Sequence, residues 1–198
     1  MFILVRYLVC PWHLLIEQLD GMKNILDVGC GHGLFLCLAQ QRFPALRCCG
    51  FDHDEKKIRL ARQARPHADI NFSSDPDGLI SWQEKFDCIS FIDVLYSIPP
   101  AQWIEILQQF RRYLKPGGTL IVKETVNHPP WKFRLCMAQE KMALQILRYT
   151  KGDAPTLPSP GVYTSALKAA GFIVLNRQRL DKGYPWPHYL VVGKSMTD

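Results

Sequence analysis

Three glycines alternate with larger residues in Asp27-Val28-Gly29-Cys30-Gly31-His32-Gly33, directly after an apolar run that begins at Ile25. A short apolar run of this kind is typical of a buried strand, and the residues after Gly33 are typical of a helix start. Glycines adopt backbone angles that other residues avoid, and they let a ligand lie directly against the main chain. The first N–H groups of the helix would point back toward the same place. The sequence therefore predicts a pocket floor for a ligand with a polar or negatively charged end.

The spacing of the glycines indicates which ligand this turn accepts. A dinucleotide fingerprint requires Gly-x-Gly-x-x-Gly, whereas the third glycine here comes one residue early, at Gly33. Asp27, two residues before Gly29, suits a ligand with a cationic amine better than a pyrophosphate. The pattern Asp-x-Gly-x-Gly-x-Gly after a strand resembles motif I of class I S-adenosylmethionine-dependent methyltransferases. That resemblance implies S-adenosyl-L-methionine as the cofactor and S-adenosyl-L-homocysteine as its product.

The resemblance also assigns individual cofactor contacts. Asp27 would reach the ammonium group of the cofactor, and the N–H groups of the turn would hold its carboxylate. The turn residues expected to line the cofactor are Gly29, Cys30, Gly31, His32 and Gly33. Asp52 would accept hydrogen bonds from both ribose hydroxyls, with helix capping as the alternative role. His53 would either stack on the adenine edge or lie exposed in its loop.

Two later segments match further motifs of the family. Asp75 would contact the adenine amino group, with Asp77 as the competing candidate, although an Asp-Pro pair is also an ordinary turn signal. The segment that ends at Tyr96 resembles motif IV, in which Asp93 and Val94 would border cofactor and substrate. It is not the Asn/Asp-Pro-Pro-Tyr motif of amine-directed nucleic-acid methyltransferases. This departure disfavours a nucleic-acid base as the methyl acceptor.

An alternating α/β sheet is needed to bring these residues together. Strands are expected at 24–28, 46–51, 69–73, 86–92 and 119–124, with helices at 33–43, 54–64 and 100–114 and a turn at 115–118. A last helix at 163–170 precedes strands at 172–179 and 188–194. The link between these two strands is too short for a crossover helix, so they should pair antiparallel. The expected fold class is α/β, a Rossmann-like, seven-stranded, mostly parallel sheet with an antiparallel C-terminal strand hairpin and helices on both faces.

Length and composition fit one ordinary domain, and the resemblance implies a single methyltransferase domain over residues 1–198, with a helical segment at 1–20 and an insert at 126–162. The insert is rich in aromatic residues and methionine, which suits a substrate lid and a helix packed on the sheet equally well. The seven cysteines form no Cys-x-x-Cys pair, so we expect free thiols in a reducing cytosol and no metal site. No signal peptide or transmembrane segment is expected, and the predicted location is cytoplasmic.

The predicted activity is methyl transfer to a small, hydrophobic or aromatic molecule, with oxygen as the preferred acceptor. A sulfonium is already a strong methyl donor, so the enzyme mainly has to align the attacking atom, which is worth about 7–11 kcal/mol. A hydroxyl acceptor would also need a base, for which Tyr96, His128 and His188 are the candidates. Two other functions remain open. The net charge of +6 suits an RNA or protein methyltransferase, but no basic stripe with interleaved aromatic residues supports it. The other is a cofactor-binding module without catalysis.

Overall fold

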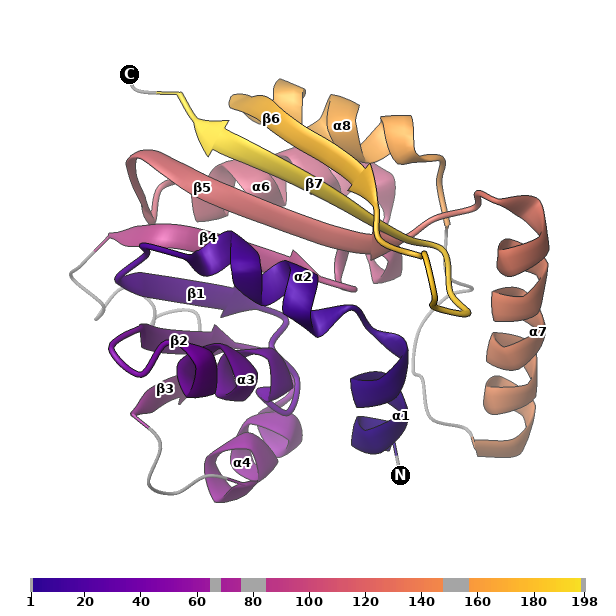
Figure 1. The fold of residues 1–198 in the computed structure, drawn as a ribbon. Coiled ribbons are helices and arrows are strands. Elements are labelled where there is room, and N and C mark those ends of the chain that lie inside the picture. Colours follow the sequence, from indigo (N-terminus) through magenta and orange to yellow (C-terminus); the bar gives the residue numbers. More distant parts are fainter. Residues whose placement is uncertain (1, 65–68, 76–84, 148–156, 197–198) are drawn as a thin grey trace.

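The computed structural model describes residues 2–64, 69–75, 85–147 and 157–196. Its centre is a seven-stranded sheet with the strand order β3-β2-β1-β4-β5-β7-β6 (Figure 1). The strands are β1 (Asn24–Val28), β2 (Arg47–Phe51), β3 (Ile70–Ser73), β4 (Phe86–Ile92), β5 (Leu114–Thr125), β6 (Phe172–Arg179) and β7 (His188–Ser195). Strands β1 to β5 pair in parallel, and β7 pairs antiparallel with both β5 and β6. The predicted fold class is confirmed, including the C-terminal hairpin.

Helices cover both faces of the sheet, which is why its central strands are largely buried and rich in apolar residues. Successive side chains of a strand point to opposite faces. Ile25 accordingly joins a core with α2 (Trp12–Ile16), α3 (Leu34–Arg42) and α4 (Glu55–Ala64), whereas Leu26 joins a core with α6 (Trp103–Arg111) and α8 (Pro160–Ala169). The 3-10 turns are η1 (Glu17–Leu19), η2 (Leu95–Ser97) and η3 (Pro100–Gln102). The helix expected at 100–114 is therefore divided into η3 and α6.

The start of β5 differs from the prediction. The turn expected at 115–118 lies inside the strand, because β5 already pairs with β4 at Leu114. Phe86 is paired with Leu114 and Cys88 with Thr119, so residues 115–118 form a bulge opposite Asp87. Gly117 in this bulge has a φ of 68°. The turn was expected to precede a strand at 119–124, whereas the structure includes residues 115–118 in β5.

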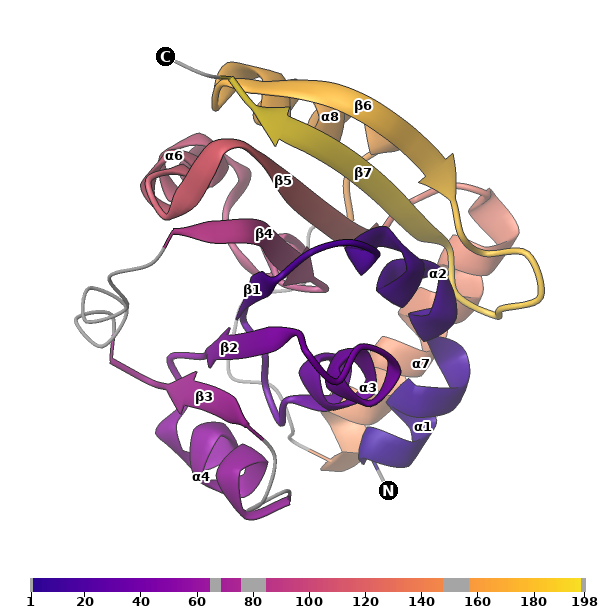
Figure 2. The same cartoon turned by 60° about the vertical axis from the view of Figure 1, so that its left-hand side comes forward.

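Strands β1 to β5 end at one edge of the sheet, which we call the carboxyl edge: residues 29–33, 52–53, 74–75, 93–96 and 126–128. Two helices, α1 (Phe2–Val9) and α7 (Pro130–Leu147), lie beyond this edge in both views (Figures 1 and 2). Pro11 separates α1 from α2, as expected for the segment 1–20. Within the described ranges, no helix has the length and apolar character needed to cross a membrane.

Candidate cofactor and methyl-transfer site

The glycine turn after β1 is fastened to the end of β2. The N–H groups of Gly29 and Cys30 both donate to the Phe51 carbonyl, at 2.7 and 3.0 Å. Gly29, Gly31 and Gly33 have φ values of 72°, 55° and 74°, in the left-handed region that favours glycine. No side chain caps the N-terminus of α3, which follows Gly33 directly. The first N–H groups of α3 therefore suit an anionic group at the carboxyl edge.

The three glycine positions of the turn differ in what an added side chain would meet. A Cβ atom on Gly33 would lie 2.4 Å from the Phe72 ring, and one on Gly29 would lie 2.5 Å from a methyl group of Val94. At Gly31 the nearest atom would be an oxygen of Asp52, at 4.0 Å. Gly29 and Gly33 are thus required by close packing as well as by backbone conformation. Gly31 is the position at which the turn is open to a ligand.

Asp52 lies beside this opening, as the sequence predicts. Its Oδ2 accepts the Gly31 N–H at 2.9 Å and its Oδ1 accepts the Asp54 N–H at 2.9 Å. The cap of α4 is Asp54, whose Oδ1 accepts the N–H groups of Lys56 and Lys57 at 2.9 and 3.3 Å. The alternative role of Asp52 as the helix cap is therefore taken by its neighbour.

Three other residues assigned to the cofactor lie at the same edge. His32 is half-buried within the turn, and burial, followed by the charge of Lys57, lowers its pKa. His53 has a side chain that is 92% exposed, 3.7 Å from Asp52. Asp75 is exposed just after β3, where its N–H donates to the Ser73 hydroxyl at 3.1 Å. Asp77 lies outside the described residues.

Asp27 is buried at 3% exposure below the glycine turn. Its Oδ1 accepts a 2.6 Å hydrogen bond from the Ser90 hydroxyl. Burial raises the pKa of Asp27 to about 7, against the lowering effects of Ser90 and Arg6. A cationic amine close by would favour the ionised form. The Asp27 carboxyl would therefore ionise more readily when an ammonium group binds next to it.

Asp93 begins the segment after β4 with a φ of 56°, which is unusual for a residue other than glycine. The Lys123 ammonium lies 2.8 and 2.7 Å from its two carboxylate oxygens, and Arg6 of α1 lies 3.3 Å from Oδ2. Burial alone would raise the pKa of Asp93, but Lys123 and then Arg6 outweigh burial and lower it. The carboxylate is thus held by β5 and α1, and Val94 is the residue that packs against Gly29.

Glu124 holds the same segment from the other face of the sheet. Its Oε1 accepts the N–H groups of Val94 and Leu95 at 3.0 and 2.8 Å, and its Oε2 accepts that of Tyr96 at 3.3 Å. Burial, followed by the charge of Asp93, raises its pKa to about 8. The sequence analysis missed Lys123 and Glu124. The available signal was a pair of charged residues inside an otherwise apolar predicted strand.

The three candidate bases lie in different surroundings. His188 is buried, and its Nε2 donates to the Val9 carbonyl at 2.7 Å, which leaves Nδ1 as an acceptor without a partner among the described residues. Burial, followed by the charge of Lys123, lowers the pKa of His188 to about 3. Tyr96 is half-buried and His128 is exposed, and they follow the paired strands β4 and β5. His188 is therefore a poor proton acceptor at neutral pH.

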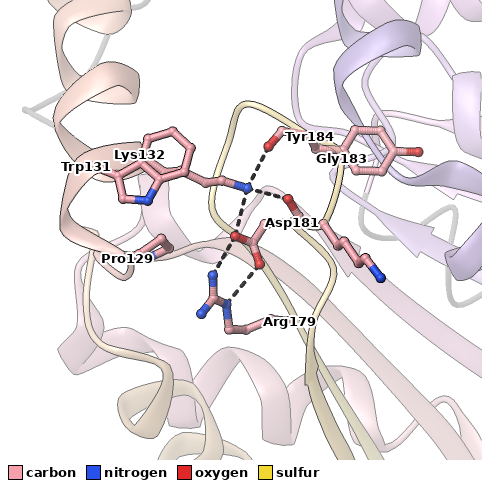
Figure 3. Close-up of a pocket in the computed structure, with 8 residues that line it drawn as sticks. Pro129, Trp131, Lys132, Arg179, Asp181, Gly183 and Tyr184 are labelled. Atoms are coloured by element: carbon pink, nitrogen blue, oxygen red, sulfur yellow. Dashed lines mark hydrogen bonds and ion pairs between the residues drawn. The ribbon is translucent and has the colours of Figure 1, made fainter.

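The base of the insert is joined to the tip of the β6–β7 hairpin beside a hollow of about 770 Å³ (Figure 3). The Lys132 ammonium donates to the carbonyls of Asp181 and Tyr184, the latter at 2.7 Å, and lies 2.9 Å from the Asp181 carboxylate. Arg179 binds both oxygens of that carboxylate, at 2.9 and 2.7 Å. Burial would raise the pKa of Asp181, but Arg179 and Lys132 outweigh it and lower the pKa to about 2. Helix α7 thus starts beyond the carboxyl edge, beside the tip of the β6–β7 hairpin, and the substrate lid stays a prediction.

The arrangement fits one cofactor chemistry. The described residues include no group of three or more His, Cys, Asp or Glu side chains that could hold a metal ion. They do combine an uncapped helix N-terminus, the open position at Gly31 and two buried carboxylates, Asp27 and Asp52. An amino-acid carboxylate, an ammonium group and ribose hydroxyls are complementary to these three features.

Comparisons with known proteins agree with this geometry. A family model described as a methyltransferase domain matches residues 4–176. The chain is 29% identical over 121 residues to trans-aconitate 2-methyltransferase of Azoarcus sp. (strain BH72), which covers 59% of this chain and 45% of that protein. It is 30% identical over 120 residues to the tRNA N(3)-methylcytidine methyltransferase trm140 of Schizosaccharomyces pombe. That match covers 56% of this chain and 39% of that protein. The chain spans about half the length of the curated relatives it matches.

Solved structures show the same fold. The S-adenosylmethionine-dependent methyltransferase SibL in its apo form superposes with a TM-score of 0.76 at 22% identity, over 96% of this chain and 55% of that chain. Human N-acetylserotonin methyltransferase in complex with its cofactor superposes with a TM-score of 0.66 at 20% identity, over 94% and 51%. Since the family model covers most of its length, the chain belongs to the S-adenosylmethionine-dependent methyltransferases, and its cofactor is S-adenosylmethionine.

Proposed function

We propose that this methyltransferase chain methylates an oxygen atom of a small molecule with an apolar or aromatic body. The observation that carries the proposal is the position of α1 and α7 beyond the carboxyl edge, the edge at which the glycine turn also lies (Figures 1 and 2). Both helices carry exposed large apolar side chains, namely Tyr7, Leu8, Trp131 and Leu135. An apolar surface beside a polar cofactor site suits a small molecule better than a phosphate backbone.

The chain's own residues divide the work of binding. Asp27 would hold the ammonium group of the cofactor, the first N–H groups of α3 its carboxylate, and Asp52 its ribose hydroxyls. When bound, the cofactor supplies a sulfonium methyl group, whose carbon–sulfur bond breaks as the acceptor oxygen bonds to the carbon. The segment 93–96, held by Lys123 and Glu124, would form the wall between cofactor and acceptor.

Oxygen is the acceptor that this site supports best. An ionised carboxylate or phenolate has no proton to lose, so it needs no general base. His188 is buried and weakly basic, which leaves Tyr96 and His128 to take a proton from a neutral hydroxyl. The relatives named for trans-aconitate support a small-molecule acceptor.

A second candidate is methyl transfer to RNA. It is favoured by the relative named for tRNA methylcytidine and by the net charge of +6. Nonspecific attraction of a basic protein to RNA is lost as salt is raised, whereas specific recognition survives. Methyl transfer to tRNA that persists from about 50 to about 200 mM salt would favour this candidate.

Titration calorimetry with S-adenosylmethionine and S-adenosylhomocysteine tests the proposal first. We expect micromolar binding to the wild type and its loss in Asp27→Ala and Asp52→Ala, with the circular dichroism spectrum retained. Asp54→Ala is the matched control, because that neighbouring carboxylate caps α4 instead. A methyl-transfer screen of phenols, carboxylic acids and tRNA follows. Normal affinity in both site variants would contradict the assignment of the cofactor site, and turnover of tRNA alone would contradict the small-molecule acceptor.

A further inference from the structure

Arg6 reaches from α1 to the end of β4, beside the cofactor turn. Its Nη2 donates to the Ile92 carbonyl at 3.1 Å and lies 3.3 Å from the Asp93 carboxylate. Val94, the next residue, packs against Gly29. Arg6 is also close enough to Asp27 to interact with it electrostatically. This guanidinium therefore lies where cofactor and acceptor have to meet.

Arg6 is the more loosely held of two cations that contact the Asp93 carboxylate. Lys123 is fully buried and binds both oxygens of Asp93 at 2.8 and 2.7 Å, which is enough to neutralise that carboxylate. Arg6 makes the longer contact with the same carboxylate, so two cations share one anion. His188, which also interacts with this group, is neutral, and the Glu124 oxygens are bound to backbone N–H groups. Asp27, the other carboxylate that interacts with Arg6, is bound to the Ser90 hydroxyl. Arg6 is therefore only partly engaged by these carboxylates and can bind the anionic group of a ligand.

Arg6, and not Lys123, is accessible to that anion. The Arg6 side chain is 29% exposed, compared with 0% for Lys123. Nη2 makes both of its hydrogen bonds, and the other N–H donors of the guanidinium have no partner within the described part of the chain. The guanidinium lies 5.9 Å from the centre of the Trp12 ring, which restricts its orientation. A planar guanidinium with unused N–H groups matches the two oxygens of a carboxylate.

We propose that Arg6 binds a carboxylate of the methyl acceptor, so that the substrates are small organic acids. The apolar part of such an acid would lie against the exposed side chains of α1 and α7, with the acceptor oxygen elsewhere on the same molecule. This inference rests on the proposed function, because it names the substrate class for that site. Arg6 thereby acts as a specificity residue and also fastens α1 to β4.

Matched acids and amides test this role on protein saturated with S-adenosylhomocysteine. The probes are cinnamate, 4-hydroxybenzoate and trans-aconitate, each compared with its neutral amide in calorimetric titrations. We expect at least one acid to bind the wild type about tenfold or more tightly than its amide. Arg6→Gln should remove that preference while leaving amide binding unchanged, and Arg6→Lys should retain part of it because it keeps the charge.

Two variants control for indirect effects. Arg42→Gln removes an arginine that also lies over an aromatic ring, Phe43, but far from the site. Trp12→Phe removes the hydrogen bond from the Trp12 indole to the Arg6 carbonyl and so perturbs α1 while keeping the guanidinium. Both should retain the preference for acids. Circular dichroism and binding of S-adenosylhomocysteine report folding and cofactor binding separately.

The outcomes distinguish this inference from the function on which it rests. An unchanged preference for acids in Arg6→Gln overturns the role of Arg6. Equal binding of acids and amides by the wild type overturns it without any variant, as does the absence of acid binding while S-adenosylhomocysteine still binds. Failure of the wild type to bind S-adenosylhomocysteine would instead count against the proposed function itself.

Discussion

Two lysine–aspartate pairs join β5 to β4, one at each end of these strands. At the amino end, Lys115 and Asp87 lie 2.6 Å apart, with the lysine side chain 42% exposed. At the carboxyl edge, Lys123 and Asp93 lie 2.7 Å apart, with the lysine fully buried. The first pair closes a bulge, whereas the second holds a residue with a φ of 56° beside the cofactor turn. Equal residue types and distances thus serve different purposes, and burial separates the two.

The difference shows where the chain accepts an energetic cost. An exposed ion pair contributes little to stability. A buried ion pair has to offset the hydration free energy that both charges have lost. Buried charges at the carboxyl edge therefore indicate an arrangement kept for its geometry. We expect the variants below to have large effects at this edge and small ones at the amino end.

The largest expected effect is that of Lys123→Met. Removal of the ammonium leaves Asp93 buried with the longer contacts to Arg6 and Thr125, so the free energy of unfolding should fall by about 3–5 kcal/mol. Lys115→Met removes the exposed counterpart and should cost less than about 1 kcal/mol. Urea unfolding followed by circular dichroism measures both. Equal costs for the two lysines would refute burial as the variable that separates the two ends.

Gly33→Ala is expected to have the next largest effect. Its Cβ would lie 2.4 Å from the Phe72 ring at a φ of 74°, so strain and overpacking together should cost about 2–4 kcal/mol. Gly117 of the β5 bulge has a φ of 68° but no atom within 4 Å of its Cβ position, so Gly117→Ala should cost only about 1 kcal/mol. Thermal unfolding and titration with S-adenosylhomocysteine distinguish them, since only Gly33→Ala should also weaken binding. Comparable losses of stability in both variants would show that backbone strain alone determines the cost of the substitution.

The two ends should also respond to pH in opposite ways. Asp27 has a pKa raised from 3.8 to about 7, so its favourable contribution is present below pH 3.8 and is lost as the pH rises through 7. Between pH 5.5 and 7.5 this loss is about 2 kcal/mol of unfolding free energy, and Asp27→Asn should remove that part of the pH dependence. The pKa of Asp87 is lowered, mainly by Lys115 and the N–H groups of Lys23 and Asn24, which outweigh burial. Its contribution is lost only in acid, so Asp87→Asn should leave this pH range unchanged.

Urea unfolding at both pH values decides this prediction. A wild-type pH dependence that persists in Asp27→Asn would mean that another group, such as Glu124 with its pKa of about 8, carries the whole effect. Glu124→Gln is the variant that would identify such a contribution.

The cofactor half of the site was readable from the sequence, because its signals are local. The strand at 24–28, the glycine turn and Asp52 lie where they were predicted, since an apolar run and a glycine spacing fix a short piece of backbone. The bulge at 115–118 was not readable, because it depends on the register of β5 against Asp87. Local signals do not determine the pairing of strands.

The acceptor half depends on contacts between distant residues. Lys123 is 30 positions from Asp93, and Arg6 is 87 positions from it. These contacts follow from the strand order and from the path of α1, neither of which appears in a motif. A sequence pattern could identify the cofactor, whereas the groups that we propose to contact the acceptor required the fold.

Arg179→Gln is expected to have the smallest effect, and it tests whether location or burial decides. Arg179 binds Asp181 at 2.7 and 2.9 Å beyond the carboxyl edge, yet its side chain is 47% exposed, and Lys132 remains as a buried partner of the same carboxylate (Figure 3). We expect a loss of less than about 1 kcal/mol in urea unfolding, similar to that of Lys115→Met at the opposite end. A loss as large as that of Lys123→Met would mean that position at this edge, and not burial, makes an ion pair important. The small loss would leave burial as the property that makes an ion pair important to stability at either end of the sheet.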